Sequence, residues 1–298
     1  MKIAVCFYGQ TRTAKFAANN LKKYFGNLIN DIDIFTHTWD VRMDRPLGML
    51  RTTFNEPVKI DAKNLEDYRV SYPHKDFLVE DQIQLRHFLQ KKYGVVGVKT
   101  VSEMTYPYHS FYRSMQFKKQ YEEMHNFKYD IVIKLRPDVI FPADRLLEYD
   151  IDEFLKDPSK LYICYHDDVF HIGTSEIMDI ASDFYIKTDV LYHSNGLPFD
   201  AFTSYMQEKD IPIVKMGDCR FTVLRHELTH LEPISHYHEI CYLNSLLYSE
   251  VFYHLRYSWK WWYNSNNAQW KEDMYYALEK TLHPDDLQII MNNHLIDV

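Results

Sequence analysis

Glycine is scarce in this chain, with eight residues in 298, whereas a typical protein has about 7%. No two of them form a Gly-x-Gly, and none begins a Gly-x-x-x-x-Gly-Lys pattern. Dinucleotide-binding folds need such glycines so that the backbone can approach a pyrophosphate, and P-loops need them to surround phosphates. The sequence therefore argues against both kinds of site. If the protein binds a nucleotide, side chains and a metal ion have to hold its phosphates.

Cysteine is also scarce, and long apolar runs are missing. The cysteines form no Cys-x-x-Cys pair, which predicts free thiols in a reducing compartment for all four, Cys6, Cys164, Cys219 and Cys241. No run of 18 apolar residues occurs, so the sequence predicts no transmembrane segment. The apolar stretch 1–7 is too short for a signal peptide. We therefore expect a cytoplasmic protein.

The charge balance is acidic, with 34 Lys and Arg against 42 Asp and Glu, a net charge of −8. Duplex binding depends on basic side chains that displace counterions, so we expect no nucleic-acid partner. Hydrophobic residues make up 46% of the chain and aromatic residues 16%, which excludes a disordered chain. A chain of this length can bury one large core, or one core and a smaller appended domain.

Short apolar runs alternate with helical patterns along the first 225 residues or so. Strands that alternate with helices of this length predict an α/β fold with a largely parallel sheet. The expected strands are 3–7, 33–37, 58–60, 130–135 and 161–164, and the expected helices are 13–25, 79–93 and 110–126. The predicted apolar faces are Leu85, Phe88 and Leu89 in 79–93, and Phe111, Ser114, Phe117, Tyr121 and Met124 in 110–126.

The character of the chain changes near residue 240. Two helical patterns, 268–281 and 284–295, follow an aromatic stretch without strand signals. We therefore expect two parts, a main α/β domain over 1–237 and an α-helical C-terminal lobe over 238–298. The aromatic cluster 259–263 is expected to pack on the main domain. Peripheral contact with a membrane surface, an acceptor or a second copy of the chain is the alternative.

Polar residues follow three of the expected strands where each one ends, at 9–12, 36–40 and 136–138. Ligands of open α/β sheets bind outside the carboxyl ends of the strands. An arginine there can contact phosphate oxygens with two N–H groups, and an aspartate can bind Mg²⁺ or Mn²⁺, which neutralises a diphosphate. The pattern is what a nucleotide-diphosphate site without a glycine loop requires. His37 and Trp39 are expected to pack in the core.

Five stretches, 3–12, 33–40, 129–138, 168–179 and 198–200, together resemble the nucleotide-sugar glycosyltransferases of the GT-A fold. The closer likeness is to transferases of bacterial polysaccharide loci and of phage or large-virus genomes. It covers roughly residues 1–225 in order, and the C-terminal lobe has no counterpart. The resemblance implies transfer of a sugar from a nucleotide-diphosphate donor to a glycan or related acceptor, in the host cytoplasm if a virus encodes the protein.

The resemblance also implies roles for single residues. Enzymes of this kind commonly carry an Asp-x-Asp motif, and here the triplet 136–138 keeps only its last carboxylate. Mn²⁺ or Mg²⁺ on Asp138 is the implied metal site, and a metal-free enzyme that relies on arginines is the alternative. The implied nucleotide contacts are Gly9, Gln10, Thr11, Arg12, Asp40 and Arg136, and Gly173 is expected to let a sugar approach the backbone.

An inverting transferase needs a carboxylate as general base on the acceptor hydroxyl. Asp200 and then Asp168 are the candidates. Other interpretations stay open for each carboxylate. Asp200 can cap a helix over 201–209, Asp168 can be a turn residue, and Asp138 can be a turn carboxylate paired with Arg136.

A competing motif, His-Glu-x-x-His-x-x-Pro-x-x-His, spans residues 226–236. It resembles the zinc site of the metzincin proteases. Pro233 stands where that family has a glycine, and proline cannot supply the positive φ of the turn. The preceding stretch 220–224 also predicts a strand, not a zinc-binding helix. A zinc metalloprotease is therefore an alternative function. A milder alternative is that a histidine of this segment supplies a late metal ligand to the transferase site. The third alternative is a catalytically inactive binding protein that keeps the GT-A-like fold.

Overall fold

The computed structural model describes most of the first 223 residues. The described ranges are 1–11, 14–42, 58–93, 101–141, 145–164, 169–187, 198–216 and 222–223. The expected C-terminal lobe, its boundary at 237/238, the aromatic cluster 259–263 and the motif 226–236 all lie outside them. These expectations stay predictions.

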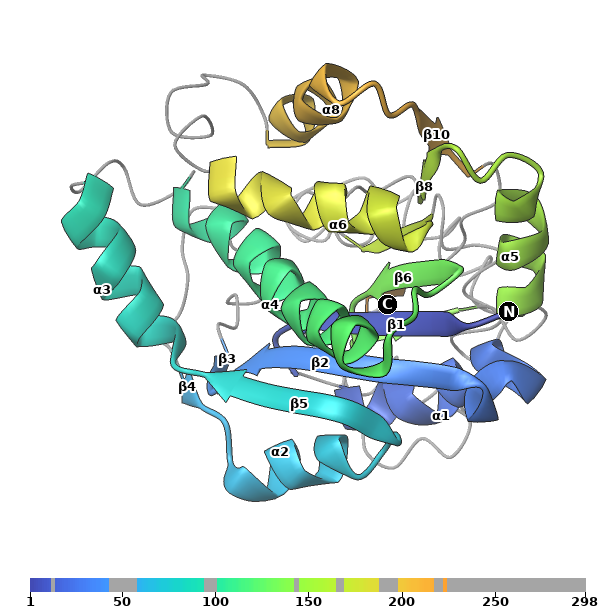
Figure 1. The fold of residues 1–298 in the computed structure, drawn as a ribbon. Helices are drawn as coiled ribbons and strands as arrows, with labels where there is room; N and C mark the ends of the chain where they lie inside the picture. The colour runs from blue at the N-terminus through green and yellow to red at the C-terminus, as the bar shows by residue number, and fades with distance from the viewer. Residues whose placement is uncertain are drawn as a thin grey trace, which may run out of the picture.

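A seven-stranded sheet in the order β10-β8-β9-β6-β1-β2-β5 forms the centre of the molecule (Figure 1). β1 (Ile3–Gly9) is parallel to both of its neighbours, β2 (Ile32–Trp39) and β6 (Ile131–Leu135). β5 (His74–Glu80) extends the parallel part beyond β2. The carboxyl ends of these four strands therefore share one edge of the sheet.

One antiparallel strand interrupts the parallel order. β9 (Phe170–Gly173) runs antiparallel between β6 and β8 (Leu161–Ile163), and β10 (Ile213–Lys215) is parallel to β8. The prediction of a largely parallel α/β sheet is confirmed, and the architecture is Rossmann-like and consistent with a GT-A fold. The strands β5, β9 and β10 were not expected from the sequence.

Helices cover both faces of the sheet (Figure 1). β1 alternates between two cores, with Ile3, Val5 and Phe7 facing one and Ala4, Cys6 and Tyr8 facing the other. Because both faces are covered, the strand is a continuous apolar run. One core includes residues of α1 (Ala14–Phe25), α2 (Ala62–Arg69) and α5 (Leu147–Leu155), and the other includes residues of α4 (Val101–His125), α6 (Ser175–Asp183) and α8 (Pro198–Glu208).

The smaller elements complete the described chain. They are α3 (Gln82–Tyr93), the 3-10 helices η1 (Gly26–Asn30) and η2 (Phe184–Lys187), and two short sheets that pair β3 (Val41–Arg42) with β4 (Val58–Lys59) and β7 (Val139–Ile140) with β11 (Thr222–Val223).

Several sequence expectations differ from the structure. The strand expected at 58–60 is the short β4, which pairs with β3 and is not in the main sheet. The helix expected at 79–93 begins at Gln82 because the preceding residues end β5, and the helix expected at 110–126 begins at Val101 and contains Pro107. Phe88 (57% exposed) and Met124 (78% exposed) were wrongly placed on buried faces.

The cysteine expectation is confirmed for one residue and wrong for another. Cys6 is buried in β1 as a free thiol. Cys164, directly after β8, is disulfide-bonded, and its partner lies outside the described residues. Among the described helices, none has the length and apolar character that crossing a bilayer requires.

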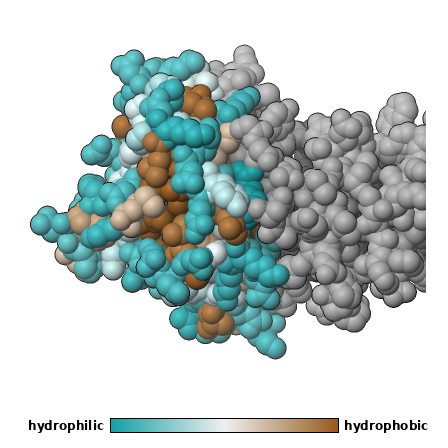
Figure 2. Space-filling view, turned by 90° about the vertical axis from the view of Figure 1, so that its right-hand side faces the viewer, coloured by the Kyte–Doolittle hydropathy of each residue, from teal (hydrophilic) through white to brown (hydrophobic). Residues whose placement is uncertain are grey.

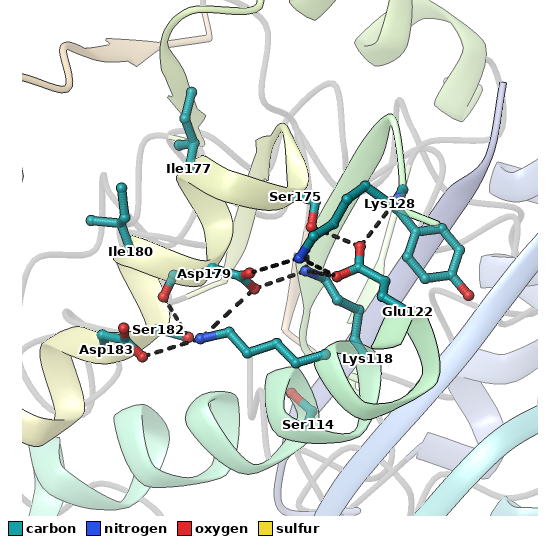
Figure 3. A network of polar contacts seen from close by, with 12 residues as sticks. Ser114, Lys118, Glu122, Lys128, Ser175, Ile177, Asp179, Ile180, Ser182 and Asp183 are labelled. Atoms are coloured by element: carbon teal, nitrogen blue, oxygen red, sulfur yellow. Dashed lines mark hydrogen bonds and ion pairs between the residues drawn. The ribbon is translucent and has the colours of Figure 1, made fainter. Parts of the chain in front are cut away.

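A buried ion-pair network joins α4 to α6 (Figure 3). Lys118 on α4 is fully buried, and its ammonium donates to Glu122 (3.0 Å), Asp179 (2.7 Å) and Ser175 (2.5 Å). These three acceptors match the three N–H groups of a lysine. Glu122 in turn accepts the backbone N–H of Tyr129, at the entry to β6 (2.8 Å). The network therefore fixes α4 against both α6 and the sheet.

Replacing Lys118 by methionine is expected to lower the free energy of unfolding by about 3 kcal/mol, because the buried Glu122 and the partly buried Asp179 would lose their buried cation and keep only the more exposed Lys128 and Lys119 nearby. The matched control is Lys119→Met. Lys119 is partly exposed and pairs with Asp183 at 3.3 Å, so its loss is expected to cost less than about 1 kcal/mol. Urea denaturation of the full chain measures both values, and equal losses would contradict the assignment.

Candidate functional site

The parallel strands bring three of the predicted site segments to one edge of the sheet. Gly9 pairs with Thr38, and Phe7 pairs with Leu135, so the segments after β1, β2 and β6 begin at similar levels. Gly9, Gln10 and Thr11 lie at the end of β1. Asp40 follows β2, and Arg136 and Asp138 follow β6. The strand arrows of β2 and β5 in Figure 1 point toward this edge. Arg12 lies outside the described residues.

The turn after β1 depends on glycine at one position. Gly9 has a φ of +100°, which side-chain-bearing residues rarely adopt. A Cβ atom placed there would meet nothing within 4 Å, so the backbone conformation, not crowding, requires glycine. The Gly9 N–H donates to Ser110 Oγ on α4 at 2.6 Å. The chain then enters α1, where the Ala14 N–H donates to the Thr11 carbonyl, and the first turn of a helix favours anions.

A chain of hydrogen bonds connects the ends of β1, β2 and β5. Gln10 Nε2 donates to Gln82 Oε1 at 2.8 Å, and the Gln82 N–H donates to Asp40 Oδ1 at 3.2 Å. The Asp40 N–H donates to the Glu80 carbonyl at 2.9 Å. Gln10 and Asp40, both predicted to contact a nucleotide, thus lie at the same edge and also hold the loops together.

Arg136 and Asp138 form a two-pronged ion pair beyond the end of β6. Arg136 Nε and Nη2 donate to the two carboxylate oxygens at 2.9 and 2.7 Å. Asp138 is buried, whereas the Arg136 side chain keeps 15% of its surface exposed. Because both Asp138 oxygens accept from Arg136, this arrangement does not fit a Mg²⁺ or Mn²⁺ site as it stands. A metal on Asp138 requires Arg136 to turn away, for example to a phosphate.

The remaining predicted residues have different surroundings. Asp168 lies outside the described residues. Asp200 is in the first turn of α8, which begins at Pro198, so it is not the cap of a helix that starts at 201. Gly173 ends β9, where a Cβ atom would lie 3.1 Å from Ile177 and 3.2 Å from Met178. Packing against α6 therefore favours glycine at this position, and the predicted approach of a sugar stays a prediction.

A cluster that sequence reasoning missed lies next to the Gly9 turn. His37 on β2, Glu80 at the end of β5 and His109 on α4 bring three ligand atoms within 4.8 Å of one another. His37 Nε2 lies 3.3 Å and His109 Nε2 2.8 Å from Glu80 Oε2. The cluster is compatible with divalent metal binding. No local spacing marks it, because its residues come from three separate elements.

Burial and hydrogen bonding set the charge states in this cluster. Burial lowers the pKa of His37 to about 4, so its imidazole is neutral near pH 7. Burial alone would raise the pKa of Glu80, but the hydrogen bond with His109 and the close approach of His37 outweigh it and hold that pKa well below its ordinary value. Arg113 Nε also donates to Glu80 Oε1 at 2.7 Å. The cluster therefore presents a neutral imidazole to an ionised carboxylate.

A separate hollow of about 590 Å³ lies at the opposite edge of the sheet, where the strands begin. Lys2, Asp33, Tyr121, Phe127 and Tyr129 are among the residues that line it. Figure 2 views the molecule from this side and shows hydrophobic residues gathered in the middle of a mainly hydrophilic surface. The hollow contains none of the predicted site residues.

Comparison with known proteins gives a distant structural likeness and no family. No family profile matches the chain, and no curated protein matches it in sequence. Among solved structures, the crystal structure of mouse xyloside xylosyltransferase 1 in its apo form is similar, with 10% identity and a TM-score of 0.38. The match covers 74% of this chain and 85% of that one. A likeness this distant carries no argument about activity.

Ser110→Ala is expected to lower the free energy of unfolding by about 2–4 kcal/mol, because it leaves the Gly9 N–H and His37 Nδ1 without their shared partner. Ser114→Ala is the control. Ser114 is equally buried one turn later on α4, but its hydroxyl donates to the Phe111 carbonyl of its own helix. We expect it to cost less than about 1 kcal/mol. Similar losses in urea denaturation would show that Ser110 does not hold the turn.

Proposed function

We propose that this protein is a glycosyltransferase that moves a sugar from a nucleotide-diphosphate donor to a glycan or related acceptor. The observation that carries the proposal is the shared edge of β1, β2 and β6. There, the Gly9 turn, which leads into α1, lies beside the end of β6, and Arg136 directly follows β6. Such an edge is where open α/β sheets bind their ligands. The ordered resemblance over residues 1–225 supports the same function.

Arg136 is the residue that we propose binds the diphosphate. Its guanidinium fits phosphate oxygens as well as it fits a carboxylate, because both accept two parallel N–H groups. Asp138 holds the guanidinium in place before the donor arrives. As the bond between the anomeric carbon and the phosphate oxygen breaks, negative charge grows on the diphosphate, and a fixed cation stabilises it.

The acceptor hydroxyl supplies the new bond to the anomeric carbon. Its oxygen attacks as the diphosphate leaves, and its proton passes to a carboxylate base. For an inverting reaction, we propose Asp200 as this base, with Asp168 as the alternative. Support for Asp200 is its position in the first turn of α8, a helix that packs on the same core as α4 and α6. The donor and the acceptor are the only reactants that this transfer needs.

The predicted cation at Asp138 remains part of the proposal in a conditional form. Mg²⁺ can bind through one carboxylate when substrate phosphates and water complete its shell. Asp138 supplies that carboxylate once Arg136 has moved to the phosphate. A bound cation would neutralise part of the diphosphate charge, and Asp138→Asn is then expected to remove the dependence of turnover on Mn²⁺ or Mg²⁺.

Arg136→Met is expected to weaken binding of the cognate nucleotide-diphosphate sugar roughly 10- to 100-fold, since it removes charge-assisted hydrogen bonds. Arg145→Met is the matched control. Arg145 also pairs with an aspartate, Asp150, but Tyr24 at the far end of α1 binds the same carboxylate, so this pair lies away from the carboxyl edge. It should cost stability without a change in donor affinity.

The measurement is titration calorimetry with UDP-, GDP-, dTDP- and CMP-sugars, with and without Mn²⁺, followed by an assay for nucleotide release. A cognate donor that binds Arg136→Met as tightly as the unchanged protein would contradict the proposed role. Donor binding without turnover, with every acceptor tried, would favour the inactive binding protein. The absence of binding by any nucleotide sugar would remove the proposal.

A further inference from the structure

The cluster of His37, Glu80 and His109 contains a buried nitrogen that lacks a hydrogen-bond partner. His37 is completely buried, and its Nδ1 lies 2.7 Å from Ser110 Oγ. The other ring nitrogen, Nε2, has no hydrogen bond although it lies 3.3 Å from Glu80 Oε2. Such orphaned groups are rare in native structures and need an explanation.

The hydrogen bonds of Ser110 are satisfied by one tautomer of His37. Ser110 Oγ accepts the Gly9 N–H, and its own hydroxyl donates to the His37 carbonyl at 3.2 Å. When the hydroxyl donates to this carbonyl, Ser110 Oγ accepts from His37 Nδ1, which then carries the proton. The lone pair of His37 Nε2 then faces a carboxylate oxygen of Glu80 at 3.3 Å, which is unfavourable without a cation between them. A histidine held through one nitrogen by a second group, with the other nitrogen unprotonated, is the usual state of a metal ligand.

Glu80 is held in a matching way. Arg113 Nε donates to Oε1 at 2.7 Å, so Oε2 is left to face both imidazoles. His109 Nε2 now donates to Oε2, and its Nδ1 has no hydrogen-bond partner. If His109 binds a metal through Nε2, its proton can move to Nδ1. Such a transfer within the ring leaves the net charge of the cluster unchanged.

The spacing of the ligand atoms suits a small divalent ion. A tetrahedral zinc ion with bonds of about 2.0 Å separates its ligand atoms by about 3.3 Å. The two separations from Glu80 Oε2 are 3.3 and 2.8 Å, and no pair in the cluster is more than 4.8 Å apart. Two imidazole nitrogens with one carboxylate favour a borderline transition-metal ion over the hard cations Ca²⁺ and Mg²⁺.

Aromatic rings enclose the cluster on one side. Trp39 stacks on His109 at 5.3 Å and meets His37 edge-on at 4.8 Å, and Tyr185 meets His109 at 4.8 Å. An apolar shell of this kind keeps water from metal ligands. The side chains of Glu80 and His109 keep 26% and 12% of their surface exposed, which leaves a path for an ion from solvent.

We propose that His37, Glu80 and His109 form a binding site for a divalent transition-metal ion of the zinc type, separate from any cation at Asp138. The ion would connect β2, β5 and α4 beside the Gly9 turn. It has three protein ligands and one position left for water or another ligand. The proposal does not depend on the proposed transferase activity.

The test uses the full chain, freed of metal with a chelator and then titrated with Zn²⁺. His109→Gln and Glu80→Gln are each expected to weaken zinc binding by more than about 100-fold, since even supporting partners of metal ligands contribute 10- to 100-fold. His125→Gln, on the exposed end of the same helix, is the matched control and should bind zinc unchanged. Zinc is expected to raise the melting temperature of the unchanged chain and of His125→Gln only.

Two further variants make the outcome decisive. His230→Gln disrupts the other histidine motif, at 226–236, and the proposal expects one zinc ion to stay bound to it. His109→Cys supplies a different zinc ligand, and it is expected to restore binding and to add the cobalt–thiolate absorption band when Co²⁺ replaces Zn²⁺. The proposal is overturned if no zinc binds, or if His230→Gln loses all zinc while His109→Gln and Glu80→Gln retain it.

Discussion

The parallel pairing of β1 with β2 and β6 is the constraint on which the rest of the structure depends. Because β1 is parallel to both neighbours, the segments after all three strands begin at one edge, although they are far apart in the sequence. α4 packs against both β1 and β2 and reaches this edge with Ser110. The hydroxyl of Ser110 binds the turn after β1 and the histidine of β2 together. The position of the site thus follows from strand pairing and one buried hydroxyl.

Paired charges are the second feature of this edge. Arg136 with Asp138, and Arg113 with Glu80, each place a guanidinium on a carboxylate close to the strand ends. The pair of Arg136 and Asp138 offers carboxylate oxygens and a guanidinium that can bind a phosphate. The pair of Arg113 and Glu80 belongs to a cluster with two imidazoles. Phosphate and transition-metal chemistry would therefore occupy neighbouring but separate places. Such side-chain chemistry agrees with a sequence that has few glycines, of which Gly9 has a positive φ at the described part of this edge.

The sequence predicted the parts of the fold that have strong apolar runs. β1, β2, β6 and β8 were found because both of their faces are buried, and their ends marked the site because parallel strands end together. β5 was missed because His74–Glu80 is a half-exposed edge strand with charged residues, and β9 because it has only four residues. The first part of α4 was not predicted because it contains Pro107, and proline is unfavourable inside a helix. The histidine cluster could not be found, since only tertiary packing brings its three residues together.

The central claim is that a nucleoside diphosphate binds at the carboxyl edge of the sheet. A crystal structure of the full chain with the cognate nucleoside diphosphate tests it most directly. The account predicts electron density for the two phosphates between the ends of β1 and β6, with the guanidinium of Arg136 in contact with a phosphate oxygen. Density in the hollow at the amino ends of the strands, near Lys2 and Asp33, would contradict it.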